Sequence, residues 1–479
     1  MGVAISSLLA SDTLSKGSEG PSLIGDNSEK TQTFVQSRHT WIIMTGMRIH
    51  LRLVVLSLAV LLSSSGSFGQ QLSKEEVSIV HSVDEEAPPA VALLERIVNI
   101  NSGTFNPPGV VEVGKVLEGE FQALGFTTRW IPMDAVQRAP SLVAERRGTR
   151  GKRVLLIGHM DTVFEPSSPF QKFVRNGDIA TGPGASDMKG GIIVILSALK
   201  ALRSAGALDG AKITVFITGD EEAPGDPIEI SRKELIEAGK NSDAVLSYEA
   251  GIREQGKDYA STARRGGSSW ELRVHAKTGH SGGIFSAEQG DGAIFEVSRI
   301  LNIFHDTLRE ANMTYSPGLL LGGLNIKAEP NGDASVAGKA NIIPGEALVR
   351  GDLRVLTPDQ LARVKNKMLS IVNSANLPGT KAEITFSDRY PPMAPTPGNV
   401  ALLAKLNEAN RALSVPEIEA LDPMQRGAGD ASFVAPFVDV LDGLGANGTG
   451  AHSPGETVDL SRMPLQSKRT ALLIYRLTQ

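Results

Sequence analysis

Apolar and polar residues alternate in blocks along most of this 479-residue chain, and the blocks predict helices and strands in turn. Short, wholly apolar runs are typical of strands buried on both faces of a sheet. Such runs stand at 154–158, 213–218 and 244–247. Apolar residues at helical spacing stand at 87–99, 110–124 and 189–205, and Gly125 is placed to end the second helix. Strands alternating with helices predict an α/β fold with a mostly parallel sheet flanked by helices.

The pattern changes near Ser261, where apolar–polar alternation replaces the apolar runs. Such alternation predicts half-exposed strands, and it occurs at 270–276, 319–326, 347–355 and 381–386. With predicted helices at 292–308 and 358–374, the order becomes βαββαβ, a split α+β unit. We therefore predict an inserted smaller domain. The predicted parts are an N-terminal extension and signal peptide at 1–69, the larger domain at 72–262 and 388–479, and the inserted domain at 263–387.

The N-terminal segment has the composition of an export signal. The charged stretch MRIHLR begins at Met47, an apolar run follows at 53–62, and small residues lead to Gly69. An apolar core of about ten residues is too short to span a bilayer comfortably as a helix. We expect translation to start at Met47 and export to the periplasm or the medium, with no membrane attachment after processing. An uncleaved anchor is the alternative.

Charge and composition limit the partners and the kinds of active site that the chain can have. A net charge of −5 gives no sign of a nucleic-acid partner. The chain has no cysteine, which excludes disulfides, thiolate metal sites and cysteine nucleophiles.

Charged side chains follow each of the predicted buried strands. They are His159 and Asp161, then Glu221 and Glu222, then Glu249, with Asp187 just before the helix at 189–205. In an open parallel sheet, ligands bind beyond the carboxyl ends of the strands. Adjacent carboxylates in a crevice repel each other, and bound metal would resolve that repulsion. Taken singly, each residue also fits a bland role: Asp187 as a helix cap, the others as solvated loop residues.

The motifs in order resemble one family. They are GHMDTV, GPGASDMKGG, TGDEE, SYEAG, TGHSGG, NIIPGEALVRGDLR and GAHSPGE. This set is similar to metallopeptidase family M20, within it the glutamate carboxypeptidase (carboxypeptidase G2-like) branch, and covers the chain from about Leu93 onward. The resemblance implies a zinc-exopeptidase catalytic domain and makes the inserted unit a lid or dimerisation domain.

The resemblance also implies a role for each matched residue. His159 and Glu249 would hold one zinc ion, Glu222 and His452 a second, and Asp187 both, beside a cis peptide to Met188. Asp161 would orient the His159 ring, and Glu221 would be the general base for a metal-activated water. Three nitrogen or oxygen ligands per ion suit catalytic zinc, although Co²⁺ or Mn²⁺ could also bind.

Three further residues belong to the inserted domain. His280 resembles a lid histidine that reaches the partner's site in a homodimer, and Asn341 and Arg354 resemble residues that hold the substrate carboxylate. Arg354 could instead pair with Asp352. For a glutamate side chain, Lys257, Arg264 and Arg265 are candidate partners. The remaining histidines, His81, His275 and His305, match no motif.

The favoured function is therefore exopeptidase cleavage of a small peptide or N-acyl amino acid before a C-terminal residue. The resemblance alone indicates glutamate as that residue. An N-acyl-amino-acid deacylase or desuccinylase of the same family is the alternative. From another class, an exported solute-binding protein would fit the two domains, but loss of a ligand or of Glu221 would be expected there, and all are present. The sequence Asn447-Gly-Thr also matches a glycosylation acceptor.

Overall fold

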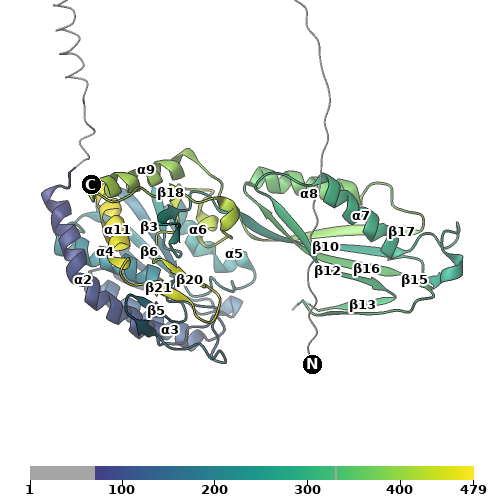
Figure 1. The fold of residues 1–479 in the computed structure, drawn as a ribbon, viewed down its shortest axis with the longest axis horizontal. Coiled ribbons are helices and arrows are strands. Elements are labelled where there is room, and N and C mark those ends of the chain that lie inside the picture. Colours follow the sequence, from purple (N-terminus) through teal and green to yellow (C-terminus); the bar gives the residue numbers. More distant parts are fainter. Residues whose placement is uncertain (1–70, 330–331) are drawn as a thin grey trace, which may run out of the picture. The chain divides into compact units, whose positions relative to one another are not determined.

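The computed structural model describes residues 71–329 and 332–479, so the predicted signal peptide lies outside the described residues (Figure 1). Within these ranges no helix combines the length and the apolar character needed to cross a bilayer.

The larger domain is built on a six-stranded sheet in the order β1-β2-β6-β3-β7-β19. The strands are β1 Thr127–Ile131, β2 Ser141–Arg146, β3 Arg150–His159, β6 Ala211–Thr218, β7 Ala244–Ser247 and β19 Val440–Leu441. β6, β3, β7 and β19 run parallel, and β2 and β1 add antiparallel strands at one edge. The predicted mostly parallel sheet is confirmed, because every predicted buried strand lies in its parallel part.

Helices pack on both faces of this sheet, as the apolar runs require. In β3, Val154 and Leu156 belong to one hydrophobic core, whereas Leu155 and Ile157 belong to another. Successive strand residues point to opposite faces, so an uninterrupted apolar run buries both. The helices are α2 Lys74–Val98, α3 Pro107–Ala123, α4 Lys189–Ser204, α5 Ile228–Ser231, α6 Lys233–Lys240, α9 Pro397–Ala412, α10 Ala431–Val434 and α11 Met463–Leu477.

The larger domain also contains two smaller sheets. One joins β4 Val174–Asn176, β5 Ile179–Thr181, β20 Gly448–Thr449 and β21 Thr457–Asp459; another joins β8 Ile252–Glu254, β9 Lys257–Ala260 and β18 Glu419–Ala420. Short 3₁₀ turns are η1 Asp134–Val136, η2 Ser281–Gly283 and η3 Pro423–Gln425.

The smaller domain has an antiparallel four-stranded sheet in the order β12-β16-β10-β17. Its elements are β10 Gly266–Ala276, α7 Ala293–Thr307, β12 Thr314–Gly323, β16 Glu346–Val355, α8 Pro358–Val372 and β17 Thr380–Tyr390. Two separate two-stranded sheets accompany it: β11 Gly279–His280 with β15 Ile342–Ile343, and β13 Asn325–Ala328 with β14 Ala334–Ala337. Its core, which includes Trp270 and Phe304, is separate from those of the larger domain.

Two element boundaries differ from the prediction for identifiable reasons. The helix predicted at 87–99 begins at Lys74, where Ser73 and Glu76 exchange capping hydrogen bonds. Pro88 and Pro89 lie inside this helix, although proline normally interrupts one. The strand predicted at 381–386 continues to Tyr390, which carries the chain back to the larger domain.

The close packing of α4 against the end of β7 gives a stability test. An added Cβ at Gly191, in the first turn of α4, would stand 2.1 Å from the Tyr248 carbonyl oxygen. That neighbour is backbone, so we expect Gly191→Ala to lower the free energy of unfolding by about 1–3 kcal/mol. Gly119→Ala in α3 is the control: nothing lies within 4 Å of its added Cβ, and stability should rise by about 0.5–1 kcal/mol. Denaturant titrations check both, and an unchanged midpoint for Gly191→Ala would contradict this packing argument.

Candidate metal centre

The parallel strands β3, β6 and β7 end at the same edge of the sheet, and the site lies beyond their ends. His159 is the last residue of β3 and pairs in register with Thr218, the last residue of β6. Ser247 ends β7 beside Ile157, so the residues that follow these strands emerge together. The predicted convergence of the side chains beyond the strand ends is therefore what the register produces.

Two histidines lie on opposite oxygens of one carboxylate. His159 Nε2 is 3.3 Å from Asp187 Oδ1, and His452 Nε2 is 3.2 Å from Asp187 Oδ2. Glu249 Oε1 lies 3.7 Å from His159 Nε2, and Glu222 Oε2 lies 2.9 Å from His452 Nε2. All five predicted metal ligands thus form two groups that share Asp187.

Asp187 is free for this role because it does not cap the helix that follows. The N-cap position of α4 is Met188, and no side chain caps the helix there. The peptide between Asp187 and Met188 is cis, as the resemblance implied. His452 comes from a loop with a positive φ of 62°, and more than half of its side chain is exposed, whereas the His159 side chain is 1% exposed.

Asp161 explains how two adjacent glutamates are held at this edge. Its Oδ1 accepts a hydrogen bond from the Glu221 N–H at 3.0 Å, and its Oδ2 accepts one from the Glu222 N–H at 3.1 Å. His159 Nδ1 lies 3.1 Å from the Asp161 carbonyl oxygen and 3.4 Å from its Oδ1. One fully buried residue therefore orients the histidine ring and fixes both glutamate backbones.

Sequence reasoning missed Glu456 and Thr104, which support the site. Glu456 is buried, and its carboxylate accepts backbone hydrogen bonds from Gly184, Ser186 and Asp187 at 2.7–3.1 Å, which fixes the loop before α4. Thr104 donates from its hydroxyl to Asp161 Oδ2 at 2.6 Å. Glu456 stands in the GAHSPGE motif, which could have indicated it; Thr104 lies far from every quoted motif.

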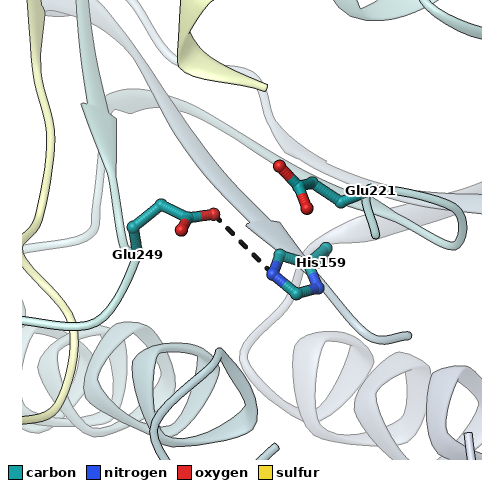
Figure 2. Close-up of side chains that lie close together, drawn as sticks. All are labelled: His159, Glu221 and Glu249. Carbon is teal, nitrogen blue, oxygen red and sulfur yellow. Dashed lines mark ion pairs between the residues drawn. The ribbon is translucent and has the colours of Figure 1, made fainter. Parts of the chain in front are cut away.

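Glu221 lies next to His159 and Glu249. Figure 2 shows its carboxylate facing that of Glu249 near the His159 ring. Ligand atoms of His159, Glu221 and Glu249 fall within 4.8 Å of one another, as do those of His159, Asp187 and Glu222. Burial, together with the charge of Glu249, raises the pKa of Glu221 well above its usual range.

The charges of the cluster call for cations. Burial and then the Asp187 charge raise the pKa of Glu249 to about 7. Hydrogen bonds to Asp187 and Glu222 raise the pKa of His452 to about 11. Burial disfavours a charged His159, yet hydrogen bonds to Asp161 and Asp187 still raise its pKa well above the usual value. The carboxylates of the cluster outnumber its two imidazoles, so protonated histidines alone cannot balance the negative charge. Bound cations can, and this set of nitrogen and oxygen donors fits Zn²⁺, Co²⁺ or Mn²⁺.

The inserted-domain residues form a separate group in the single chain. His280 pairs with Ile342 across β11 and β15, and the Ser281 N–H donates to the Asn341 carbonyl oxygen at 3.1 Å. Arg354 Nε donates to Asp352 Oδ2 at 2.8 Å, which is the alternative partner expected from the sequence. Among the described residues, His280, Asn341 and Arg354 share no hydrogen bond or ion pair with the cluster around Asp187.

Of the candidate basic partners, Lys257 and Arg265 are engaged elsewhere. Lys257 pairs with exposed Glu419 at 2.7 Å, and the Arg265 guanidinium donates to Thr314 and to the Met424 carbonyl. Arg264 lies 3.9 Å from Glu249, as does Arg426, which sequence reasoning missed.

The proposed glycosylation acceptor is unsuited to its role in the folded chain. Asn447 is 5% exposed, and its amide donates to the Gly251 carbonyl oxygen at 3.0 Å. Its oxygen accepts from Arg462 Nε at 3.2 Å.

The chain is similar to known proteins in sequence and in fold. The chain is 28% identical to carboxypeptidase G2 of Pseudomonas sp. (strain RS-16) over 433 residues, which cover 88% of the chain and 97% of that protein. It is 27% identical to succinyl-diaminopimelate desuccinylase of Acidiphilium cryptum (strain JF-5), covering 73% of the chain and 88% of that protein. The fold resembles the Bacillus subtilis YXEP protein, described as a dinuclear metal-binding peptidase, with a TM-score of 0.55 and 14% identity over 82% of the chain and 99% of that structure.

The model of one family matches two thirds of the chain, from the middle of β3 into α11, and so includes every predicted metal ligand. Since peptidase family M20/M25/M40 matches residues 155–476, the chain belongs to that family.

Proposed function

We propose that this M20 enzyme is a di-zinc exopeptidase that hydrolyses the amide bond before a C-terminal amino acid, with glutamate as the released residue. Family membership itself makes the chain an enzyme of the peptidase and amidohydrolase type. The observation that carries the proposal is the position of Asp187, with one oxygen toward His159 and the other toward His452. A carboxylate placed in this way is suited to bridging two ions.

Each proposed ion has three protein ligands. His159, Glu249 and Asp187 would hold one ion, and His452, Glu222 and Asp187 the other. Three ligands leave a coordination position for water or substrate, as catalytic sites require. Zn²⁺ is our first choice, and Co²⁺ or Mn²⁺ would fit the same donors. When bound, the ions polarise the scissile carbonyl and lower the pKa of the attacking water.

Glu221 has the position and environment of a general base. The Asp161 carboxylate holds its backbone N–H, while its own carboxylate has no hydrogen-bond partner among the described residues. Burial raises its pKa, so it can accept a proton from the attacking water and return it to the leaving amine nitrogen. The carbonyl carbon gains the water oxygen, the carbon–nitrogen bond breaks, and Glu221 ends ionised as it began.

Substrate recognition would involve the inserted domain of a homodimer. We place the partner's His280 beside the scissile carbonyl as a hydrogen-bond donor, and Asn341 and Arg354 at the C-terminal carboxylate. A guanidinium fork suits a carboxylate, and Arg264 and Arg426 add positive charge near Glu249. Glutamate as the released residue rests on resemblance to the carboxypeptidase G2-like branch.

The second candidate is an N-acyl-amino-acid deacylase or desuccinylase, favoured by the 27% identity to a succinyl-diaminopimelate desuccinylase. Turnover of dipeptides, N-acyl glutamates and N-succinyl amines by one preparation would separate the two candidates. We also propose that the enzyme is exported, on the strength of the signal-like segment at 47–69. Size and N-terminal sequence of the protein recovered from the periplasm or medium test this.

The general-base assignment has a direct test. We expect Glu221→Gln to keep two zinc ions per chain, because Glu221 is not a ligand, and to lower kcat by a factor of about 10²–10⁴. Metal analysis and steady-state kinetics check this. Glu237→Gln, at an exposed residue that pairs with Lys240, is the matched control. Full activity in Glu221→Gln would remove Glu221 from the mechanism.

Metal-free protein should lose stability as the pH rises. Folding raises the pKa of Glu249 from 4.5 to about 7 and that of His452 from 6.5 to about 11. The stability that these two groups contribute is fully present below their unfolded pKa values of 4.5 and 6.5, and it is lost as the pH rises toward their folded values of about 7 and about 11. We expect chelator-treated protein to melt at a lower temperature at pH 8 than at pH 5.5.

Zinc reloading should abolish that decline, because the ions replace the bound protons. Thermal melts of both forms at the two pH values provide the measurement. A decline of equal size in zinc-loaded protein would show that other groups are responsible.

The homodimer proposal predicts complementation between two inactive variants. In a mixed dimer of His280→Ala and Glu221→Gln chains, one site combines an intact Glu221 with the partner's His280. We expect refolded mixtures to recover activity that neither variant has alone, up to about half of the wild-type rate per mixed dimer. Each variant refolded by itself is the control, and a mixture no more active than its components would place His280 in its own chain's site or outside the mechanism.

A further inference from the structure

The segments that connect the two domains pair with each other. Residues 262–266 lead out of the larger domain, and 388–393 lead back into it. Between them Arg264 and Met393 form an isolated antiparallel bridge, with N–H to oxygen distances of 2.9 and 3.0 Å. A change in the position of the smaller domain must therefore pass through this pair of segments.

The outgoing segment is anchored near one carboxylate of the cluster. Arg264 donates to Asp442 Oδ2 at 2.7 Å and to the carbonyl oxygens of Gly427 and Ala428 at 2.6 and 2.9 Å. Its guanidinium also lies 3.9 Å from Glu249. These bonds fix the segment to the loop before α10.

The returning segment is bonded to Glu221. The Tyr390 hydroxyl donates to the Glu221 carbonyl oxygen at 2.8 Å, and the Tyr390 ring packs on Phe433 with 5.2 Å between centroids. Tyr390 is the last residue of β17, a strand of the smaller domain. The side chain at the end of this strand, in the segment that returns from the smaller domain, thus contacts the backbone of the proposed general base.

Buried charged side chains hold the backbone that leads into Glu221. Asp161 accepts its N–H at 3.0 Å. The preceding residue, Asp220, accepts two bonds from fully buried Arg232, at 2.7 Å to Oδ1 and 3.0 Å to the carbonyl oxygen. Arg232 Nε donates to Asp430 Oδ1 at 2.7 Å. These bonds fix the backbone up to the Glu221 N–H. The hydrogen bond from Tyr390 fixes the position of the Glu221 carbonyl group, which follows it.

We propose that Tyr390 is a positioning residue: by fixing the Glu221 carbonyl, it sets the direction of the Glu221 carboxylate and links it to the placement of the returning segment. The inference rests on the general-base role proposed for Glu221. Because the carboxylate has no hydrogen-bond partner of its own among the described residues, its direction depends on the backbone at its base. Small errors in the placement of a catalytic group cost large factors in rate.

Tyr390→Phe removes the hydroxyl and keeps the ring on Phe433. We expect kcat to fall about tenfold, KM to stay within about twofold and zinc content to remain at two per chain, since binding and metal ligands are untouched. Tyr315→Phe is the matched control, because the Tyr315 hydroxyl also donates to a backbone carbonyl, that of Phe304, at 2.7 Å inside the smaller domain. It should lose comparable stability and no kcat.

The same substitution in a Glu221→Gln background completes the test. If Tyr390 acts through Glu221, Tyr390→Phe should have little further effect on the residual kcat there. An unchanged kcat for Tyr390→Phe, a change in KM alone, or an equal loss in both backgrounds would overturn the inference. Wild-type turnover by Glu221→Gln itself would instead refute the general-base proposal, and the inference with it.

Discussion

Mutual repulsion among carboxylates in a buried crevice is the constraint on which this site depends. Asp161, Asp187, Glu221, Glu222 and Glu249 meet around two imidazoles, and burial raises the pKa values of the three glutamates. Such a cluster is tolerable only when cations or well-placed donors offset each charge. The surrounding structure supplies donors to Asp161 from backbone and hydroxyl groups, and it leaves the oxygens of Asp187 directed at the histidines.

Much of this arrangement could be predicted because it depends on regular structure. Apolar runs predicted the parallel strands, and parallel strands necessarily present their carboxyl ends at one edge. His159, Glu222 and Glu249 could thus be grouped before any coordinates, and the α/β fold and the family assignment are confirmed. Their individual roles as ligands stay predictions. His452 could be grouped only through the resemblance, because it lies on a loop in the C-terminal part of the chain.

The residues that escaped prediction act through contacts that join distant parts of the sequence. Glu456 holds the Asp187 loop through three peptide N–H groups, across about 270 residues of sequence. Thr104 and Arg426 likewise owe their roles to residues that are distant in sequence and close in space, Asp161 and Glu249. Neither periodicity nor composition carries such information. The error at α2 is of another kind: its predicted start is too late, and the helix in fact continues through two prolines because tertiary context can override local propensity.

The two histidines differ in how they reach the shared carboxylate. His159 is the sealed end of a central strand, while His452 approaches from an open loop with a strained backbone. The two halves of the centre therefore differ in exposure: the His159 half belongs to the central sheet, and the His452 half faces solvent. Metal ions and substrate would both enter from the exposed half. Substitutions in the loop around His452 would therefore alter the centre with the least effect on the fold.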